Sequence, residues 1–279
     1  MSTPPPLPPQ ESRAPGLDSF DPVPASSFPE HGEKTGPWGF WATLSIGLAI
    51  GLVWIVSQII FGVGYFLIRL SGERFDRESS DRLFKGLEHD GLMIGTASLG
   101  ALPVILAGCV FFAWLRRKQG ITICEYLALN SMSWKSWIFW PVATIPIMLA
   151  VSYILIQLGA PEIDPWMKAL GENVTHFGWL ALAIVVCAPI GEEFIFRGFL
   201  FKGWMESGLG KWGTVLLTSF LFAIIHSQYG VWGLTGVFTL GVLMGIARVR
   251  SNSLWAPISI HFANNLMATY GIYEIMVGE

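Results

Sequence analysis

Residues 91–115 read GLMIGTASLGALPVILAGCVFFAWL and contain no Asp, Glu, Lys or Arg. A helix that spans a membrane needs about 20 consecutive, mostly apolar residues. This stretch therefore predicts a transmembrane helix. Residues 35–68 and 136–161 also lack formal charge and predict two more.

The composition agrees with a membrane protein. Apolar residues make up 52% of the 279 residues and charged residues only 13%, whereas soluble domains carry about 25% charged residues. The net charge of −3 lacks the basic excess of a nucleic-acid binder, so no nucleic-acid partner is expected. Three cysteines are too few for a disulfide framework. An ordinary soluble enzyme and a disordered protein are excluded as well.

The carboxyl-terminal half predicts further helices. A fourth helix is expected from residue 173 to about residue 204, and a last one over 254–273. The uncharged stretch 212–247 would be about 54 Å long as one helix, well beyond a bilayer. Its Ser-Gln-Tyr-Gly segment at 227–230 has turn composition, so two helices, 212–226 and 231–247, are expected. The predicted fold class is all-α, a polytopic transmembrane bundle of about seven helices.

The amino-terminal residues differ in character from the rest. Residues 1–38 hold 10 of the 17 prolines and predict a disordered tail. We expect residues 39–177 to form amino-terminal transmembrane helices, and residues 178–273 a catalytic helical core. Eleven Lys and Arg residues fall on the side of the amino terminus and six on the other side. This asymmetry favours a cytoplasmic amino terminus.

A few polar residues interrupt the apolar helices. A charged side chain at a helix centre costs about 2.5–3.5 kcal/mol on insertion scales, so those that persist usually face a protein interior and have a function. Glu193 and Arg197 are four residues apart and can pair on one helix face. Glu192 is rotated by about 100° from Glu193, which leaves its carboxylate free. The other polar positions are His226, His261, Asn264 and Asn265.

The polar positions are predicted to lie at a similar depth. Glu192 and His226 are equally far from the connection near Leu209, so an antiparallel hairpin would place them at one level. His261 and Asn265 follow the next connection on the same side by about 10 and 14 residues, within one or two helical turns of that level. We therefore expect one polar layer near the middle of the bilayer.

This layer has the groups for hydrolysis by water. The sequence contains neither GxSxG nor HExxH, which disfavours a serine hydrolase of that type and the usual zinc helix. A Glu and a His can deprotonate a water directly or hold a metal ion that activates it. Glu192, His226 and His261 are the possible ligands of Zn²⁺, and the alternative is no cofactor. His261 and Asn265 can donate hydrogen bonds to a developing oxyanion.

Three motifs resemble those of one family. The segment 188–198, APIGEEFIFRG, resembles the EExxxR motif of the CAAX-processing and bacteriocin-processing (CPBP, or Abi) intramembrane endopeptidases. Residues 222–226, FAIIH, are similar to their FxxxH motif, and 261–265, HFANN, to their HxxxN motif. The three motifs lie in the family's order within about residues 178–272.

The resemblance implies a role for each matching residue. Glu192 with His226 would activate water, His261 and Asn265 would form the oxyanion hole, and Glu193 and Arg197 would support them. The implied protein is an intramembrane endopeptidase in the bacterial cell (inner) membrane. It would contact membrane lipid and cleave a membrane-associated peptide or a prenylated or leader-bearing protein.

Two other functions fit a bundle with buried polar residues. One is a non-catalytic immunity or scaffold protein of the same family, although such a protein need not retain all three polar clusters. The other is a transporter, in which buried charged residues are also common. Transporters often contain internal repeats, and none is visible here.

Overall fold

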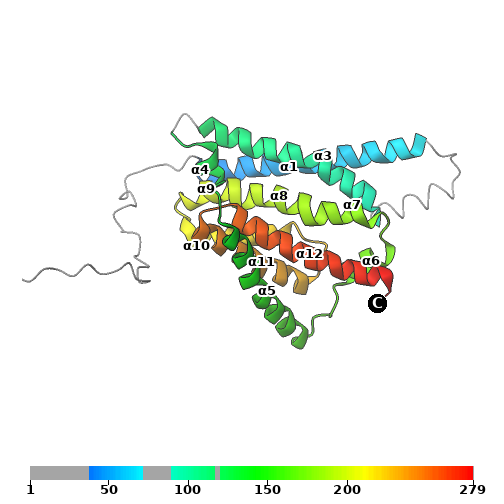
Figure 1. Cartoon of the computed structure of the whole chain (residues 1–279). Coiled ribbons are helices and arrows are strands. Elements are labelled where there is room, and N and C mark those ends of the chain that lie inside the picture. The colour runs from blue at the N-terminus through cyan, green and yellow to red at the C-terminus, as the bar shows by residue number, and fades with distance from the viewer. Residues whose placement is uncertain (1–37, 72–88, 117–119, 279) are drawn as a thin grey trace, which may run out of the picture. The chain divides into compact units, whose positions relative to one another are not determined.

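The computed structural model describes residues 38–71, 89–116 and 120–278, and the regular structure of these residues is helical (Figure 1). The elements follow one another in the order α1 (Phe40–Ser71), α3 (Gly91–Leu115), α4 (Ile123–Leu127), α5 (Trp134–Gln157), α6 (Pro165–Asn173), α7 (Phe177–Leu182), η4 (Ala183–Cys187), α8 (Ala188–Glu193), η5 (Phe194–Leu200), α9 (Phe201–Met205), α10 (Gly210–Ile224), α11 (Val231–Ser251) and α12 (Trp255–Val277). The elements η4 and η5 are π-helical turns.

Five helices of the described residues are long and apolar enough to cross a membrane. They are α1, α3, α5, the continuous run Phe177–Met205 and α11. The chain is therefore an integral membrane protein. Of the seven expected spans, α10 has only 15 residues, and α12 is less apolar because its sequence includes His261, Asn264 and Asn265. These two helices do not qualify as spans by length and composition.

The expected break in the stretch 212–247 is present. Helix α10 ends at Ile224 and α11 begins at Val231. His226 consequently lies in the turn that follows α10, whereas the predicted helix 212–226 included it. Its backbone N–H donates to the carbonyl of Ala223, a bond that tightens the last turn.

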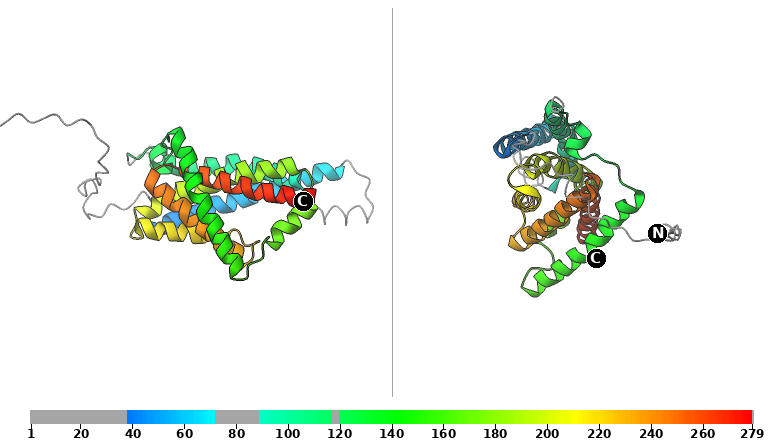
Figure 2. Two further views of the ribbon diagram at one scale, coloured as in Figure 1. Left: turned by 60° about the horizontal axis from the view of Figure 1, so that its bottom comes forward. Right: turned by 90° about the vertical axis from the view of Figure 1, so that its left-hand side faces the viewer.

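Helix α1 packs against α3, and both pack against the run from α7 to α9 (Figure 1). Helix α12 packs on the other side of that run, against α5, α6 and α11. Helix α5 is inclined to α3 and α12 in Figure 1 and in the left view of Figure 2. Small residues permit close approach: a Cβ at Gly203 of α9 would overlap Thr43 of α1, and one at Gly95 of α3 would overlap Trp179 of α7.

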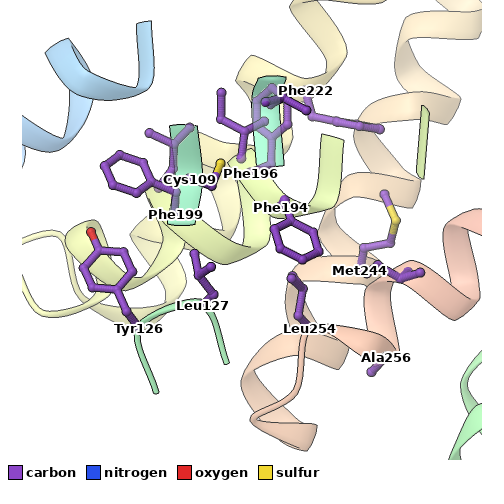
Figure 3. Packing of buried hydrophobic residues seen from close by; sticks show 14 of the residues in the cluster. Cys109, Tyr126, Leu127, Phe194, Phe196, Phe199, Phe222, Met244, Leu254 and Ala256 are labelled. Carbon is purple, nitrogen blue, oxygen red and sulfur yellow. The ribbon is translucent and has the colours of Figure 1, made fainter. Parts of the chain in front are cut away.

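The centre of the apolar core is η5, whose seven residues are all buried. Figure 3 shows Phe194, Phe196 and Phe199 of this turn among the surrounding side chains. The segment around α4 packs against it, because Tyr126 stacks on Phe199 at 5.6 Å between ring centroids. The same segment is hydrogen-bonded to the start of α12, since the N–H of Leu254 donates to the carbonyl of Ala128 at 2.7 Å.

Two predictions fall largely outside the described residues. The expected disordered tail, 1–38, is described only at residue 38. Four of the six basic residues on the side expected to be exported lie in 72–88, namely Arg74, Arg77, Arg82 and Lys85. The orientation of the chain in the membrane therefore stays a prediction.

Candidate active site

The two adjacent glutamates lie on α8, a short α-helical segment between the π-helical turns η4 and η5. π-Helical turns within α-helices are rare, and those that occur often lie at functional sites. The extra residue of such a turn changes the direction of the side chains that follow. Glu192 is 8% exposed and Glu193 is fully buried. Both carboxylates therefore face the inside of the protein and not the acyl chains.

The turn η4 leaves one backbone carbonyl without a helical donor. The N–H of Ala188 donates to the carbonyl of Ala183, which is the π-helical register. In the same register the carbonyl of Ile184 would accept from residue 189, but Pro189 has no N–H. Asn265 supplies the missing donor, since its Nδ2 donates to the Ile184 carbonyl at 2.8 Å. Asn265 thereby joins α12 to the segment that precedes Glu192.

Glu193 connects two of the polar positions. Its Oε1 accepts from Arg197 at 2.9 Å, the pair expected from their spacing, and lies 3.0 Å from Nδ1 of His261. A carboxylate only accepts hydrogen bonds, so the hydrogen of this bond belongs to Nδ1 of His261. All three side chains are at most 3% exposed. Glu193 therefore fixes the ring orientation of His261 and leaves its Nε2 for the site.

Two arginines lie inside the protein. Arg197 is fully buried, donates to the carbonyl of Gly241 at 3.1 Å, and lies over the ring of Phe222 at 4.5 Å. Arg248 is 2% exposed and donates from Nε to the carbonyl of Arg197 at 3.0 Å. Both count among the eleven basic residues on the side of the amino terminus that predict the orientation. Their guanidinium groups bond groups within the bundle.

The two imidazoles converge on Glu192. His226 Nδ1 lies 2.7 Å from the carbonyl of Phe222 and must donate to it, because a carbonyl only accepts. The Nε2 atoms of His226 and His261 lie 4.0 Å and 3.8 Å from Oε2 of Glu192. This oxygen is buried and has no hydrogen-bond partner among the residues that the structure describes. A buried oxygen without a partner is costly, which points to a small polar molecule as its partner in the working protein.

These groups surround a cavity of about 190 Å³. Its wall includes all four residues that the sequence indicated for the chemistry, Glu192, His226, His261 and Asn265. Asn264 also lines it, and its Nδ2 donates to Oδ1 of Asn265 at 3.4 Å. The structure thus brings together side chains from α8, the turn after α10, and α12.

The cavity wall also contains residues that the sequence did not indicate. Trp166 and Met167 come from α6, while Gln228 and Tyr229 come from the turn that carries His226. The rings of Trp166 and Tyr229 contact each other edge to face at 5.4 Å. Sequence signals for them are weak: Trp166 follows Pro165 at a helix start, and Tyr229 lies in the predicted turn. Only their packing over the cavity distinguishes them.

The expected zinc ligands do not form a metal site. The described residues contain no group of three His, Cys, Asp or Glu side chains that could hold a metal ion. Zinc in a catalytic site binds three protein ligands at about 2.0–2.2 Å for nitrogen and oxygen. The set of Glu192, His226 and His261 does not fit this arrangement.

Residues 174–267 match the family model of the type II CAAX prenyl endopeptidases, described as Rce1-like. The matched segment contains the EExxxR, FxxxH and HxxxN motifs with all their polar residues. Residues 174–267 form an Rce1-like domain. The match confirms the family resemblance that the three motifs predicted.

Two bacterial relatives extend the similarity beyond the Rce1-like domain. An uncharacterized 24.3 kDa protein of Escherichia coli is 29% identical over 157 residues, which are 55% of this chain and 70% of that protein. The uncharacterized protein YyaK of Bacillus subtilis (strain 168) is 26% identical over 155 residues, which are 52% of this chain and 50% of that protein. No solved structure matches the chain.

Proposed function

We propose that this protein is an intramembrane endopeptidase, which hydrolyses a peptide bond of a membrane-associated peptide or of a prenylated or leader-bearing protein. The observation that carries this proposal is the unpartnered Oε2 of Glu192, buried in a cavity and approached by Nε2 of His226 and His261. The Rce1-like family model over the same residues gives the reaction class.

Glu192 and His226 suit the activation of a water. With its Nδ1 hydrogen donated to Phe222, neutral His226 offers the lone pair of Nε2, and Glu192 offers Oε2. These atoms are 4.0 Å apart, so one water oxygen can lie about 2.8 Å from both and donate a hydrogen to each. The remaining lone pairs of that water would then face a carbonyl carbon held in the cavity.

The reaction balances on these groups. The water oxygen bonds to the carbonyl carbon as one of its protons passes to Glu192 or His226. The C–N bond then breaks, and the leaving nitrogen takes up that proton and departs as an amine. The second proton of the water also passes to the nitrogen, so the products are a carboxylate and an ammonium group, and each side chain regains its starting state.

His261 and Asn265 are placed to stabilise the oxyanion. Asn265 Nδ2 carries two hydrogens, of which one is donated to the Ile184 carbonyl and the other is available to substrate. The Nδ1 hydrogen of His261 is donated to Glu193. His261 can therefore also donate from Nε2 only when both ring nitrogens carry a hydrogen. In that form, the positive charges of His261 and Arg197 would equal in number the negative charges of Glu192 and Glu193.

The relatives, the basic residues and the family also support a proposed location, orientation and substrate class for the protein. The relatives are bacterial, so we place the protein in the bacterial cell membrane, with the amino terminus in the cytoplasm as the basic residues predict. Peptide and protein substrates follow from the family. Residues 178–273 would be the catalytic core and 39–177 its supporting helices.

The decisive experiment replaces Glu192 by Gln, which keeps the shape and removes the base. Purified protein in detergent is incubated with a prenylated peptide and with a leader peptide, and cleavage is followed by mass spectrometry. The variant should lose cleavage by on the order of 10²-fold or more and keep its thermal unfolding profile. Glu162→Gln, on an exposed loop, is the matched control. Full cleavage by Glu192→Gln would refute the proposal.

A further inference from the structure

A second cavity lies against Glu192. Its volume is about 120 Å³, and it is walled by Trp54 and Gln58 of α1, Ser98 and Leu102 of α3, and Cys187, Ala188 and Glu192. The first cavity is walled instead by α6, α10, α11, α12 and the turn after α10. Glu192 and Ala188 are the residues common to both walls. One carboxylate therefore borders two compartments formed by different helices.

The second cavity has the lining of a small polar compartment. Gln58 and Ser98 contribute an amide and a hydroxyl within helices that are otherwise strongly apolar. Neither side chain has a hydrogen-bond partner among the residues that the structure describes. Polar groups that face an apolar interior without a partner cost free energy. A volume of 120 Å³ holds about four waters at roughly 30 Å³ each.

The first cavity must hold both reactants of the hydrolysis. Its 190 Å³ must hold the peptide bond and the adjoining side chains of a substrate, and hydrolysis consumes one further water for each bond cleaved. A bound peptide would separate the water between Glu192 and His226 from solvent on that side. Glu192 still borders a compartment that the peptide does not occupy.

We propose that the second cavity, between α1, α3 and Glu192, is a water-binding site that supplies the hydrolytic water from the side opposite the peptide. Gln58 and Ser98 hold the water, and Glu192, which borders both cavities, takes it up for the reaction. This inference rests on the proposed peptidase function. It assigns the amino-terminal helices a part in the reaction, with Gln58 and Ser98 as positioning residues.

The kinetic test uses Gln58→Leu, Ser98→Ala and the double variant. Loss of a hydrogen bond to the water should lower kcat on the order of tenfold and leave KM unchanged, because neither residue borders the peptide cavity. Gln58→Asn should recover part of kcat. Ile59→Leu, next to Gln58 on the exposed face of α1, should be unaffected.

Unchanged kcat in the double variant, with Glu192→Gln inactive, would overturn this inference alone. An active Glu192→Gln would overturn the peptidase function itself.

A second test measures access of water to the cavity by cysteine labelling, and its readout does not depend on activity. Ser98→Cys and Leu99→Cys are treated in proteoliposomes with methanethiosulfonate ethylammonium, and labelling above the level of the native cysteines is measured by mass spectrometry. Thiolates form only in contact with water, so Cys at 98 should react and Cys at the 36% exposed position 99 should not. Labelling of the position-98 thiol only after the protein has been unfolded in sodium dodecyl sulfate would show a cavity closed to water and overturn the proposal.

Discussion

At the scale of single residues, neighbouring glutamates have different surroundings. Oε1 of Glu193 is bonded to Arg197 and His261, whereas the Glu192 carboxylate borders the two cavities. Among the described residues, neither Oε2 has a hydrogen-bond partner. The i, i+4 spacing of Glu193 and Arg197 made their pairing predictable. The other partner of Glu193, His261, is 68 residues away along the chain, so only the fold could reveal it.

The buried pair Glu193–Arg197 predicts strong coupling in stability. Glu193→Gln or Arg197→Met alone should lower the free energy of unfolding by about 3–5 kcal/mol, because each leaves a buried charge unpaired. The double variant should lose less than the sum of the two. Unfolding midpoints in detergent measure the cycle. Additive losses would show that the two charges do not depend on each other.

At the scale of elements, the break in hydrogen bonding at η4 explains why Asn265 is bonded to Ile184. Asn265→Ala should lower the free energy of unfolding by about 1–3 kcal/mol, because the Ile184 carbonyl loses its donor. Adding Pro189→Ala should restore part of the stability, since Ala at 189 has an N–H for that carbonyl. Thermal unfolding in detergent tests this. If Pro189→Ala added a further loss, the proposed replacement of one donor by the other would be wrong.

The same pair of variants separates structure from chemistry. Under the proposed function, cleavage should stay low in the Asn265→Ala, Pro189→Ala double variant even where its stability recovers, because the second amide hydrogen of Asn265 is still missing. Recovery of both cleavage and stability would limit Asn265 to a structural role. Cleavage rates are compared at equal amounts of folded protein.

At the scale of the whole molecule, Asp90 joins three helices at one end of the bundle. Its carboxylate accepts from Tyr65 and Arg69 of α1 at 3.0 and 2.7 Å, from the Leu92 N–H of α3 at 3.0 Å, and lies 3.2 Å from Nδ1 of His176, which precedes α7. Burial by itself would raise the pKa of Asp90, but the hydrogen bonds from Tyr65, Leu92 and His176 outweigh it and lower the pKa below its ordinary 3.8.

A lowered pKa in the folded protein makes Asp90 stabilising wherever it is ionised. Asp90→Asn should therefore lower the unfolding temperature at pH 7. The deficit should shrink only below about pH 4, as the wild-type carboxyl takes up its proton and loses the same stabilisation. Unfolding temperatures of both proteins are measured from pH 7 downward, with Glu162→Gln as control. A deficit that shrank already at pH 6 would assign the effect to another group.

The sequence by itself determined that the chain is a helical membrane protein and which family its carboxyl-terminal part resembles. Uncharged stretches long enough to cross a bilayer are a local property, and so are the three motifs. The turn at 227–230 was also readable, although not that α10 would end before His226.

The tertiary structure alone decided which groups meet. The donor to the Ile184 carbonyl comes from α12, the wall of the first cavity includes α6, and the second cavity is built by α1 and α3. Such contacts depend on how helices cross and how closely small residues let them approach. Neither can be deduced from the spacing of residues along one helix. Burial of Arg248 was hidden for the same reason, because its hydrogen-bond partner, the carbonyl of Arg197, is 51 residues away along the chain.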